Sequence, residues 1–406
     1  MASTWRSLGE VRDAAGDYRG ALDALKAAAK LLQDDPIAQA EIYEARALAR
    51  IRLSSYSEAL REITAGLNRV RTLNTAEAKQ AANSLLARRA QIYLQQGRAR
   101  ETIAIANEVV KEAEPLGPSI ALARAYSALE GAYLSIGEPE NAVYEEKALE
   151  MFRSLGAARS AAVMEMNLGV KAYAQGWWQE ATQRYSNARS EFERLGDVTQ
   201  AAYAGANLGE VLISWGLFQE AEAVLTDARR TLRNSSYLFA AVFCEIQLAR
   251  LAIATGNVAS AIPELTRIVE EARSKGDVGF AVDAWIHLAD AYARIGEPDR
   301  SLSELAEAER LLEDASPLRA PLARIRATAL IQQGDLSAAG EELSSALHVA
   351  QGQGLAYEEA QALRALAGLA QMDGRDAEAD AALHEAERLM QRIGATRSKD
   401  EDAEPA

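Results

Sequence analysis

The chain has 406 residues, 49% of them hydrophobic, and a formal net charge of −15. That charge argues against direct nucleic-acid binding, which needs a basic surface, and it suits a soluble protein or a basic partner. The only cysteine is Cys244, which excludes an internal disulfide framework. The first ten residues lack the apolar core of a signal peptide, and the longest uncharged run, 251–263, is too short to span a bilayer. We therefore expect a cytoplasmic protein without a membrane segment.

One pattern recurs ten times, with a step of 38 to 43 residues. A turn residue stands at Gly16, Ser54, Gly97, Gly137, Gly176, Gly216, Gly256, Gly296, Gly334 and Gly374. A small residue follows each of them by five positions, and a small residue precedes each by seven, except at Glu130. Glycine takes positive φ without steric cost, and small residues let two helices approach closely. The sequence therefore predicts ten helical hairpins, with Ser54 in place of the one missing glycine.

The hairpins differ in regularity along the chain. The first begins close to Met1, and we expect Trp5 on its packing face. Either the polar side of this helix serves as the cap of the solenoid, or the chain is the tail of a larger protein. The second and third are irregular, because Arg46 and Arg89 stand where most repeats have leucine. The fourth lacks one residue in its second helix, since Ala148 comes one position early, and the pattern is regular from the fifth onward.

Glycines also end several of the second helices. Gly156, Gly196, Gly276 and Gly394 follow the last apolar residues of such helices, as C-cap glycines do. After Gly394 the chain is polar and acidic. We therefore expect a solenoid over residues 1–394 and a disordered tail over residues 395–406.

These hairpins resemble the tetratricopeptide repeat, in which paired helices stack into a superhelix. The motif residues are Trp5, Leu8, Gly9 and Ala21 in the first repeat, Leu208, Gly209, Leu212 and Ala221 in the sixth, and Trp285, Leu288, Ala289 and Tyr292 in the eighth. The resemblance implies an all-α, right-handed superhelical solenoid. The period is about 40 residues instead of about 34, which leaves HEAT and armadillo repeats as the structural alternative. The glycine-to-alanine spacing argues against that alternative.

The last repeats also resemble the C-terminal repeat region of bacterial signalling ATPases and of adenylate-cyclase-like and LuxR/MalT-like regulators. The resemblance rests on their alanine content and on the Leu-Gly-Asp helix endings. In those proteins such repeats follow a nucleotide-binding domain.

No catalytic motif stands out. The sequence has no Walker A loop and no G-x-G-x-x-G after a strand. His287, His348 and His384 lie in three different repeats, and none has a second histidine at metal-ligand spacing. We therefore expect no enzyme activity, no cofactor and no metal.

The residues 13, 10, 6 and 3 positions before each turn residue share one face of the first helix. The resemblance implies that this face lines a concave groove that holds peptides. The predicted groove residues are Val163, Met166, Val170, Tyr173, Tyr203, Ile213, Phe243, Ile246, Ile253, Ile286, Arg250 and Arg294. Tyr203, Phe243 and Ile246 are the expected hot spot, and Arg250 and Arg294 are expected to fix an acidic group. The alternative is that these side chains fill a tightly wound interior.

A polar ladder accompanies the groove. Asn167, Asn207, Gln247 and His287 each stand nine positions before a turn residue. The resemblance implies that such amides bind the backbone of an extended peptide. Hydrogen bonding between helices of the solenoid is the alternative.

The predicted function is a non-catalytic scaffold or adaptor that docks a peptide or helical segment of a partner protein in its groove. The alternative is the sensor or regulatory repeat arm of a bacterial signalling ATPase, adenylate cyclase or transcriptional regulator. Direct binding to nucleic acid or membrane is not expected, and self-association through the solenoid ends is possible. Trp177 and Leu217, beside two turn glycines, are expected to face outward as a second contact patch.

Overall fold

The structure, a computed structural model, describes residues 1–136, 138, 141–235, 237–275, 282–312 and 316–394. The expectations for Gly137, Gly276 and the tail at 395–406 fall outside the described residues. Within the described residues, no helix is both long enough and apolar enough to cross a membrane.

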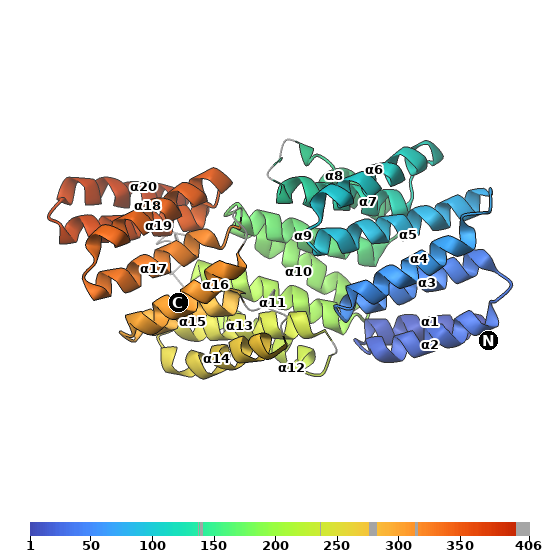
Figure 1. Cartoon of the computed structure of the whole chain (residues 1–406), viewed down its shortest axis with the longest axis horizontal. Helices are drawn as coiled ribbons and strands as arrows, with labels where there is room; N and C mark the ends of the chain where they lie inside the picture. The colour runs from blue at the N-terminus through green and yellow to red at the C-terminus, as the bar shows by residue number, and fades with distance from the viewer. Residues whose placement is uncertain (137, 139–140, 236, 276–281, 313–315, 395–406) are drawn as a thin grey trace, which may run out of the picture. The chain divides into compact units, whose positions relative to one another are not determined.

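Twenty α-helices and one short 3-10 turn make up the regular structure of the described part, which contains no strand (Figure 1). The first ten helices are α1 (Ala2–Ala14), α2 (Tyr18–Leu31), α3 (Pro36–Arg52), α4 (Tyr56–Val70), α5 (Ala76–Gln95), α6 (Ala99–Ala113), α7 (Ile120–Ser135), α8 (Glu145–Ser154), α9 (Ala158–Ala174) and α10 (Trp178–Arg194). The others are α11 (Val198–Trp215), α12 (Phe218–Leu232), α13 (Leu238–Ala254), α14 (Val258–Lys275), α15 (Val282–Arg294), α16 (Pro298–Leu311), α17 (Arg319–Gln333), α18 (Leu336–Gln353), α19 (Ala356–Met372) and α20 (Asp376–Arg392). The prediction of an all-α solenoid of helical hairpins is confirmed.

Two compact units divide the chain, and each is described by itself. Unit 1 comprises Met1–Leu168, Asn187–Ala202 and Thr231–Leu238. Unit 2 comprises Gly169–Ser186, Tyr203–Arg230 and the residues from Phe239 onward. The four helices α9 to α12 contribute residues to both units.

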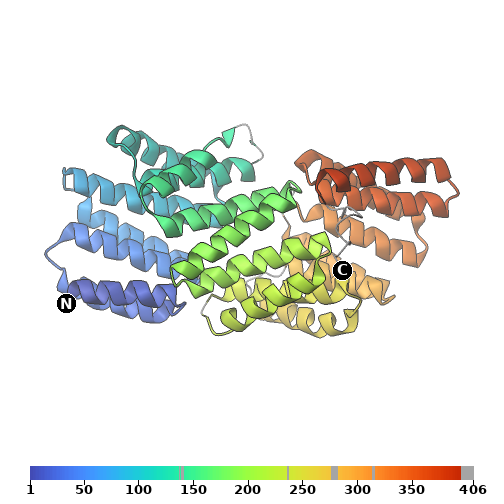
Figure 2. The same ribbon diagram turned by 180° about the vertical axis from the view of Figure 1, so that it is seen from behind.

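Within each unit, the odd-numbered first helices form a continuous wall. Each packs against its even-numbered partner, as α1 does against α2 and α19 against α20 (Figures 1 and 2). Successive first helices also pack on each other, as α3, α5 and α7 do in unit 1 and α15, α17 and α19 in unit 2. We call this surface the inner wall of the unit.

The hairpin turns adopt the predicted left-handed backbone. At Gly216 φ is +82°, and the N–H of Leu217 donates to the carbonyl of Leu212 at 2.9 Å, which closes α11. Ser54 has φ +55° and is the only non-glycine residue with positive φ among the described residues. Its prediction as the stand-in for a turn glycine is therefore confirmed. The predicted C-cap glycines Gly156, Gly196 and Gly394 also have positive φ.

The two helices of a hairpin meet where the predicted small residue lies. A Cβ added to Gly209 would lie 2.5 Å from Cγ of Leu225, and one added to Gly9 would lie 2.9 Å from Cγ of Leu25. The close neighbour of Gly209 is therefore Leu225, nine positions after the turn. Gly169 has the same relation to Tyr185, at 2.7 Å. The carbonyl oxygen of Ala21, five positions after the turn, lies 3.4 Å from the added Cβ of Gly9.

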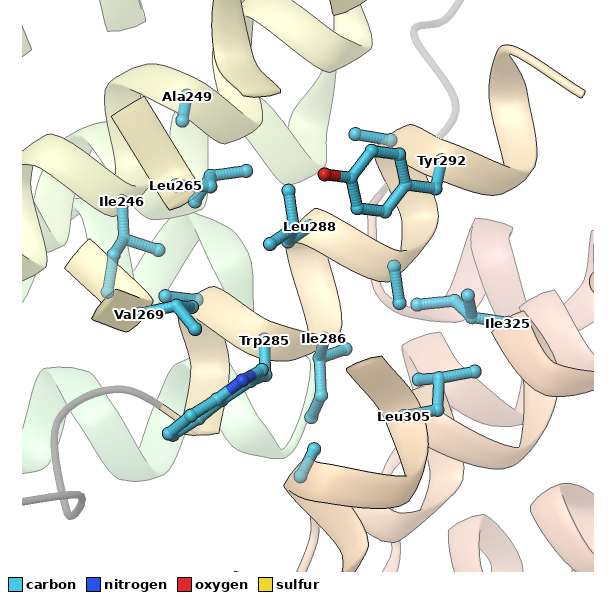
Figure 3. Close-up of a cluster of buried hydrophobic side chains, with 14 of the residues drawn as sticks. Ile246, Ala249, Leu265, Val269, Trp285, Ile286, Leu288, Tyr292, Leu305 and Ile325 are labelled. Atoms are coloured by element: carbon cyan, nitrogen blue, oxygen red, sulfur yellow. The ribbon is translucent and has the colours of Figure 1, made fainter. Parts of the chain in front are cut away.

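One hydrophobic cluster of unit 2 is built from helices α13 to α17, and smaller clusters lie among α17 to α20. Figure 3 shows Trp285, Leu288 and Ile286 of α15 between Leu265 of α14 and Leu305 of α16. Trp285 is fully buried, although its indole is large. Burying such side chains contributes about 1.5–3 kcal/mol each, so the hairpins are held to one another mainly by apolar contact.

Gly209→Ala should destabilise the protein by about 1–3 kcal/mol, because the new methyl group overpacks against Leu225. Urea denaturation followed by circular dichroism measures this change.

Gly368→Ala in α19 is the matched control, since a Cβ there would meet no atom within 4 Å. It should stabilise the protein by up to about 1 kcal/mol, because alanine favours a helix over glycine. Equal effects of the two substitutions would contradict the close approach at Gly209.

Candidate functional site

The inner wall of unit 2 carries both polar groups and partly exposed aromatic rings where the sequence predicted an apolar stripe. Ile213, Ile246, Ile253 and Ile286 are buried, and the last three belong to the core of Figure 3. The expectation that these four line an open groove is wrong. They lie at the seams where one first helix packs against the next, so neighbouring helices cover them.

Arg250 of α13 stands at the centre of the polar surface. Its Nη2 donates to Oγ of Ser214 at 2.7 Å, and its Nη1 donates to Oε1 of Gln247 at 3.3 Å. Oε1 of Glu210 lies 3.5 Å from Nη1, and the hydroxyl of Tyr173 lies 3.5 Å from both Nη atoms. Oγ of Ser214 and the hydroxyl of Tyr173 are 2.8 Å apart. We call these five residues the Arg250 cluster.

The charged side chains of the Arg250 cluster are largely withdrawn from water. The side chains of Arg250 and Glu210 keep only 18% and 20% of their exposure. Burial raises the pKa of Glu210 to about 7, against the opposing effect of Arg250. Burial disfavours the charged form of Arg250, yet Tyr173 and Glu210 outweigh it and raise the pKa of Arg250. The guanidinium therefore stays charged, close to a carboxyl group that is near its titration point at neutral pH.

More charged pairs continue along the same wall. Nε2 of His287 lies 3.4 Å from Oδ1 of Asp283 within α15. Nε of Arg324 in α17 donates to Oε2 of Glu358 in α19 at 3.2 Å. The predicted groove residue Arg294 is exposed and pairs with Asp290 of its own helix at 3.0 Å.

Three aromatic rings form a patch on α11 and α13. The ring centroids of Tyr203 and Phe243 are 5.9 Å apart, and those of Tyr203 and Phe239 are 5.8 Å apart, both in edge-on geometry. All three rings are partly exposed. Phe239 was missed because it lies one helical turn before the first position of the stripe that the sequence analysis followed.

Three of the four residues of the predicted polar ladder form polar contacts within the protein. Nδ2 of Asn207 donates to the carbonyl of Tyr203 at 2.9 Å, and Gln247 is fully buried and accepts from Arg250. His287 faces Asp283, as described above. Asn167 is exposed and belongs, with Val163 and Met166, to unit 1. The contacts of Asn207, Gln247 and His287 all lie within the helix that carries each residue, so binding to a peptide backbone and hydrogen bonding between helices both stay predictions.

Two tryptophans beside hairpin turns of unit 2 contact residues of its last hairpin. Trp178 is fully buried, with its ring 5.1 Å from that of Tyr357 in α19. Nε1 of Trp215 donates to the carbonyl of Gly394 at 2.7 Å. Trp177 faces outward and is 54% exposed, as expected, whereas Leu217 is half-buried. Residues of the last hairpin therefore contact residues beside the turns at Gly176 and Gly216.

Among the described residues, no three His, Cys, Asp or Glu side chains gather in the manner of a metal site. The single thiol, Cys244, is buried and lies 3.5 Å from the carbonyl oxygen of Leu225.

Comparisons with protein-family models and with curated proteins find no match. Among solved structures, a Rap protein complexed with competence and sporulation factor is 11% identical and has a TM-score of 0.68, over 87% of this chain and 98% of that chain. NprR in complex with its cognate peptide NprX is 11% identical with a TM-score of 0.49, over 78% of this chain and 85% of the other.

A signal transduction ATPase with a tetratricopeptide repeat sensor, from Pyrococcus horikoshii, is 16% identical with a TM-score of 0.48. The match covers 77% of this chain and 47% of that protein. The fold, together with its likeness to the Rap protein structure, defines a tetratricopeptide-like helical repeat protein. The alternative of a regulatory arm of a signalling ATPase stays a prediction.

The raised pKa of Glu210 predicts a specific pH dependence. Between its ordinary value of 4.5 and about 7, the folded protein binds more protons at this site than the unfolded chain does. The contribution of Glu210 to stability therefore falls as the pH rises through this window.

Glu210→Gln should consequently gain stability relative to the wild type from about pH 4.5 to 7, by at most about 1.4 kcal/mol per pH unit. Urea denaturation of both proteins across this range measures the difference. The free energy of unfolding of the variant minus that of the wild type should increase as the pH rises. A value that stays constant or decreases with rising pH would refute the assignment.

Proposed function

We propose that this chain is a non-catalytic recognition scaffold that binds a short peptide segment of a partner protein on the inner wall of unit 2. The observation that carries the proposal is the Arg250 cluster. Taking a charge pair out of water costs free energy, and well-packed apolar side chains often give equal or greater stability. A confined ion pair of this kind is therefore better explained by recognition than by folding.

The wall offers two kinds of contact to one segment. Arg250 has five N–H donors, and a guanidinium forms strong charge-assisted hydrogen bonds to carboxylates. Tyr203, Phe239 and Phe243 offer partly exposed rings on the neighbouring turns of α11 and α13. Aromatic and arginine side chains dominate the binding energy of most protein interfaces. The segment we propose carries an acidic residue near an apolar one.

The fold comparison supports this proposal indirectly. The Rap protein that shares the fold was solved in complex with competence and sporulation factor. At 11% identity the likeness shows the fold alone, so the ligand of this chain is inferred from its own wall. Cytoplasmic location and self-association through the solenoid ends remain predictions from the sequence.

The double variant Arg250→Gln with Glu210→Gln tests the site without leaving a buried charge unpaired. A phage-displayed random peptide library panned on the wild type should enrich peptides that contain Asp or Glu beside an apolar residue. The best of these, made synthetically, should bind the double variant at least tenfold more weakly in calorimetry, because the charge-assisted hydrogen bonds are lost.

Arg326→Gln is the matched control. This arginine also lies on a first helix, α17, but it pairs with Glu309 and Glu342 on the neighbouring second helices. It should bind the selected peptides as the wild type does. Failure to enrich any peptide, or equal affinity in the double variant, would reject the proposed function.

A further inference from the structure

The helices of unit 2 form a closed circuit. Tyr173 of α9 contacts Ser214 of α11, and Arg250 of α13 donates to the same hydroxyl group. From α13 onward each first helix packs on the next, up to α19. The ring of Tyr357 in α19 then lies 5.1 Å from that of Trp178 in α10. The last hairpin, α19 and α20, therefore returns to the hairpin at which the unit begins.

We call the contact that closes this circuit the seam. Its residues are Gly176, Trp178 and Trp215 on one side, and Ala356, Tyr357, Ile393 and Gly394 of the last hairpin on the other. The two sides approach closely, because a Cβ added to Gly176 would lie 2.5 Å from Cγ2 of Ile393 and 3.5 Å from Cβ of Ala356. Both Ala356 and Ile393 are buried.

The polar groups of the seam are poorly satisfied. Nε1 of Trp178 is buried and has no hydrogen-bond partner among the described residues. An unsatisfied buried donor costs free energy. The hydrogen bond from Nε1 of Trp215 to the carbonyl of Gly394 is exposed, so water can replace it when the seam opens.

The last hairpins are also held by small side chains. In the hydrophobic clusters among α17 to α20, Leu343 and Leu369 are the only buried members larger than alanine among the described residues. The cluster of Figure 3 contains Trp285, Leu288 and Leu305 instead. Because the stabilisation grows with the apolar area buried, the last hairpins are held less strongly. Weakly held elements open before the rest of a protein unfolds.

The last hairpin lies beside the proposed peptide site as well as at the seam. Burial lowers the pKa of Arg250, and the hydroxyl group of Tyr357 is among the groups that oppose burial and raise it. The next residue, Glu358, accepts from Arg324 of the inner wall. Helix α19 is therefore close to the Arg250 cluster, in which the side chain of Arg250 is only 18% exposed.

We propose that the last hairpin is a gate: the seam opens without unfolding of unit 2 and exposes the Arg250 cluster to the peptide. This inference rests on the proposed function of the same wall. A peptide that binds the open form has an apparent dissociation constant equal to the intrinsic one divided by the open fraction. Weakening the seam should therefore tighten peptide binding.

The first test of the gate needs no peptide. Ala356→Cys places a thiol in the seam, and the native thiol of Cys244, buried in α13, is the internal reference. Both are alkylated with iodoacetamide under native conditions, and each rate is divided by the rate of the same thiol in urea. The introduced thiol should react at least tenfold faster than Cys244. Equal rates would mean that the seam opens only on global unfolding, and would overturn the proposal.

The second test weakens the seam. Gly176→Ala should raise the alkylation rate of the introduced thiol and tighten binding of the display-selected peptides at least threefold in calorimetry, because the new methyl group meets Ile393. Gly216→Ala is the matched control. It has the same positive φ, +82° against +79°, but its added Cβ meets no described atom within 4 Å. It should label and bind as the wild type does.

Trp215→Phe removes the hydrogen bond to Gly394 and keeps an aromatic ring. It should act in the same direction as Gly176→Ala, and it keeps the test decisive if that variant does not fold by circular dichroism. Unchanged or weaker peptide binding in the seam variants would overturn the gate. If no peptide binds the wild type, the proposed function fails, while the alkylation rates still decide whether the last hairpin opens.

Discussion

The close approach of two helices at a small residue is the constraint on which each hairpin depends. Gly209 has no room for a methyl group against Leu225, and Gly9 and Gly169 show the same contact with the residue sixteen positions later. A left-handed turn residue then fixes how the chain reverses between the two helices. Because the same geometry recurs at a nearly constant step, first helices stack on first helices and form an inner wall in each unit.

Both inner walls carry charged groups that are partly withdrawn from water. In unit 2 the group is Arg250 with Glu210 and Tyr173, and in unit 1 it is Arg88 and Arg124 with Glu44. The apolar seams between helices supply the packing that holds the hairpins together. The charged groups on the walls are therefore not needed for that apolar packing, and this is why we propose recognition as the role of the Arg250 cluster.

The sequence alone predicted the helical repeat correctly, but it did not predict which residues are exposed on the inner wall. Spacing alone predicted the turn at Ser54 and the crossing at Gly209, because both are local requirements of one hairpin. It placed Ile246 and Ile286 in a groove, since helical periodicity says which residues share a face but not which neighbour covers that face. The contact of Trp215 with Gly394 spans 179 residues, and no local pattern reports such a contact.

The charged group on the inner wall of unit 1 shows the same limit. Arg88 and Arg124 lie in the third and fourth hairpins, where the repeat pattern is irregular. Their convergence on Glu44 depends on how α3, α5 and α7 stack, which the repeat pattern does not specify.

The most direct test of this account asks whether the Arg250 cluster exists for stability. Glu210→Leu with Arg250→Met replaces the charged pair by apolar side chains of similar volume, and the urea midpoint reports the consequence. The account predicts a midpoint equal to or above that of the wild type, because the desolvation cost disappears. A midpoint clearly below that of the wild type would contradict it, because it would show that the charged pair itself stabilises the fold.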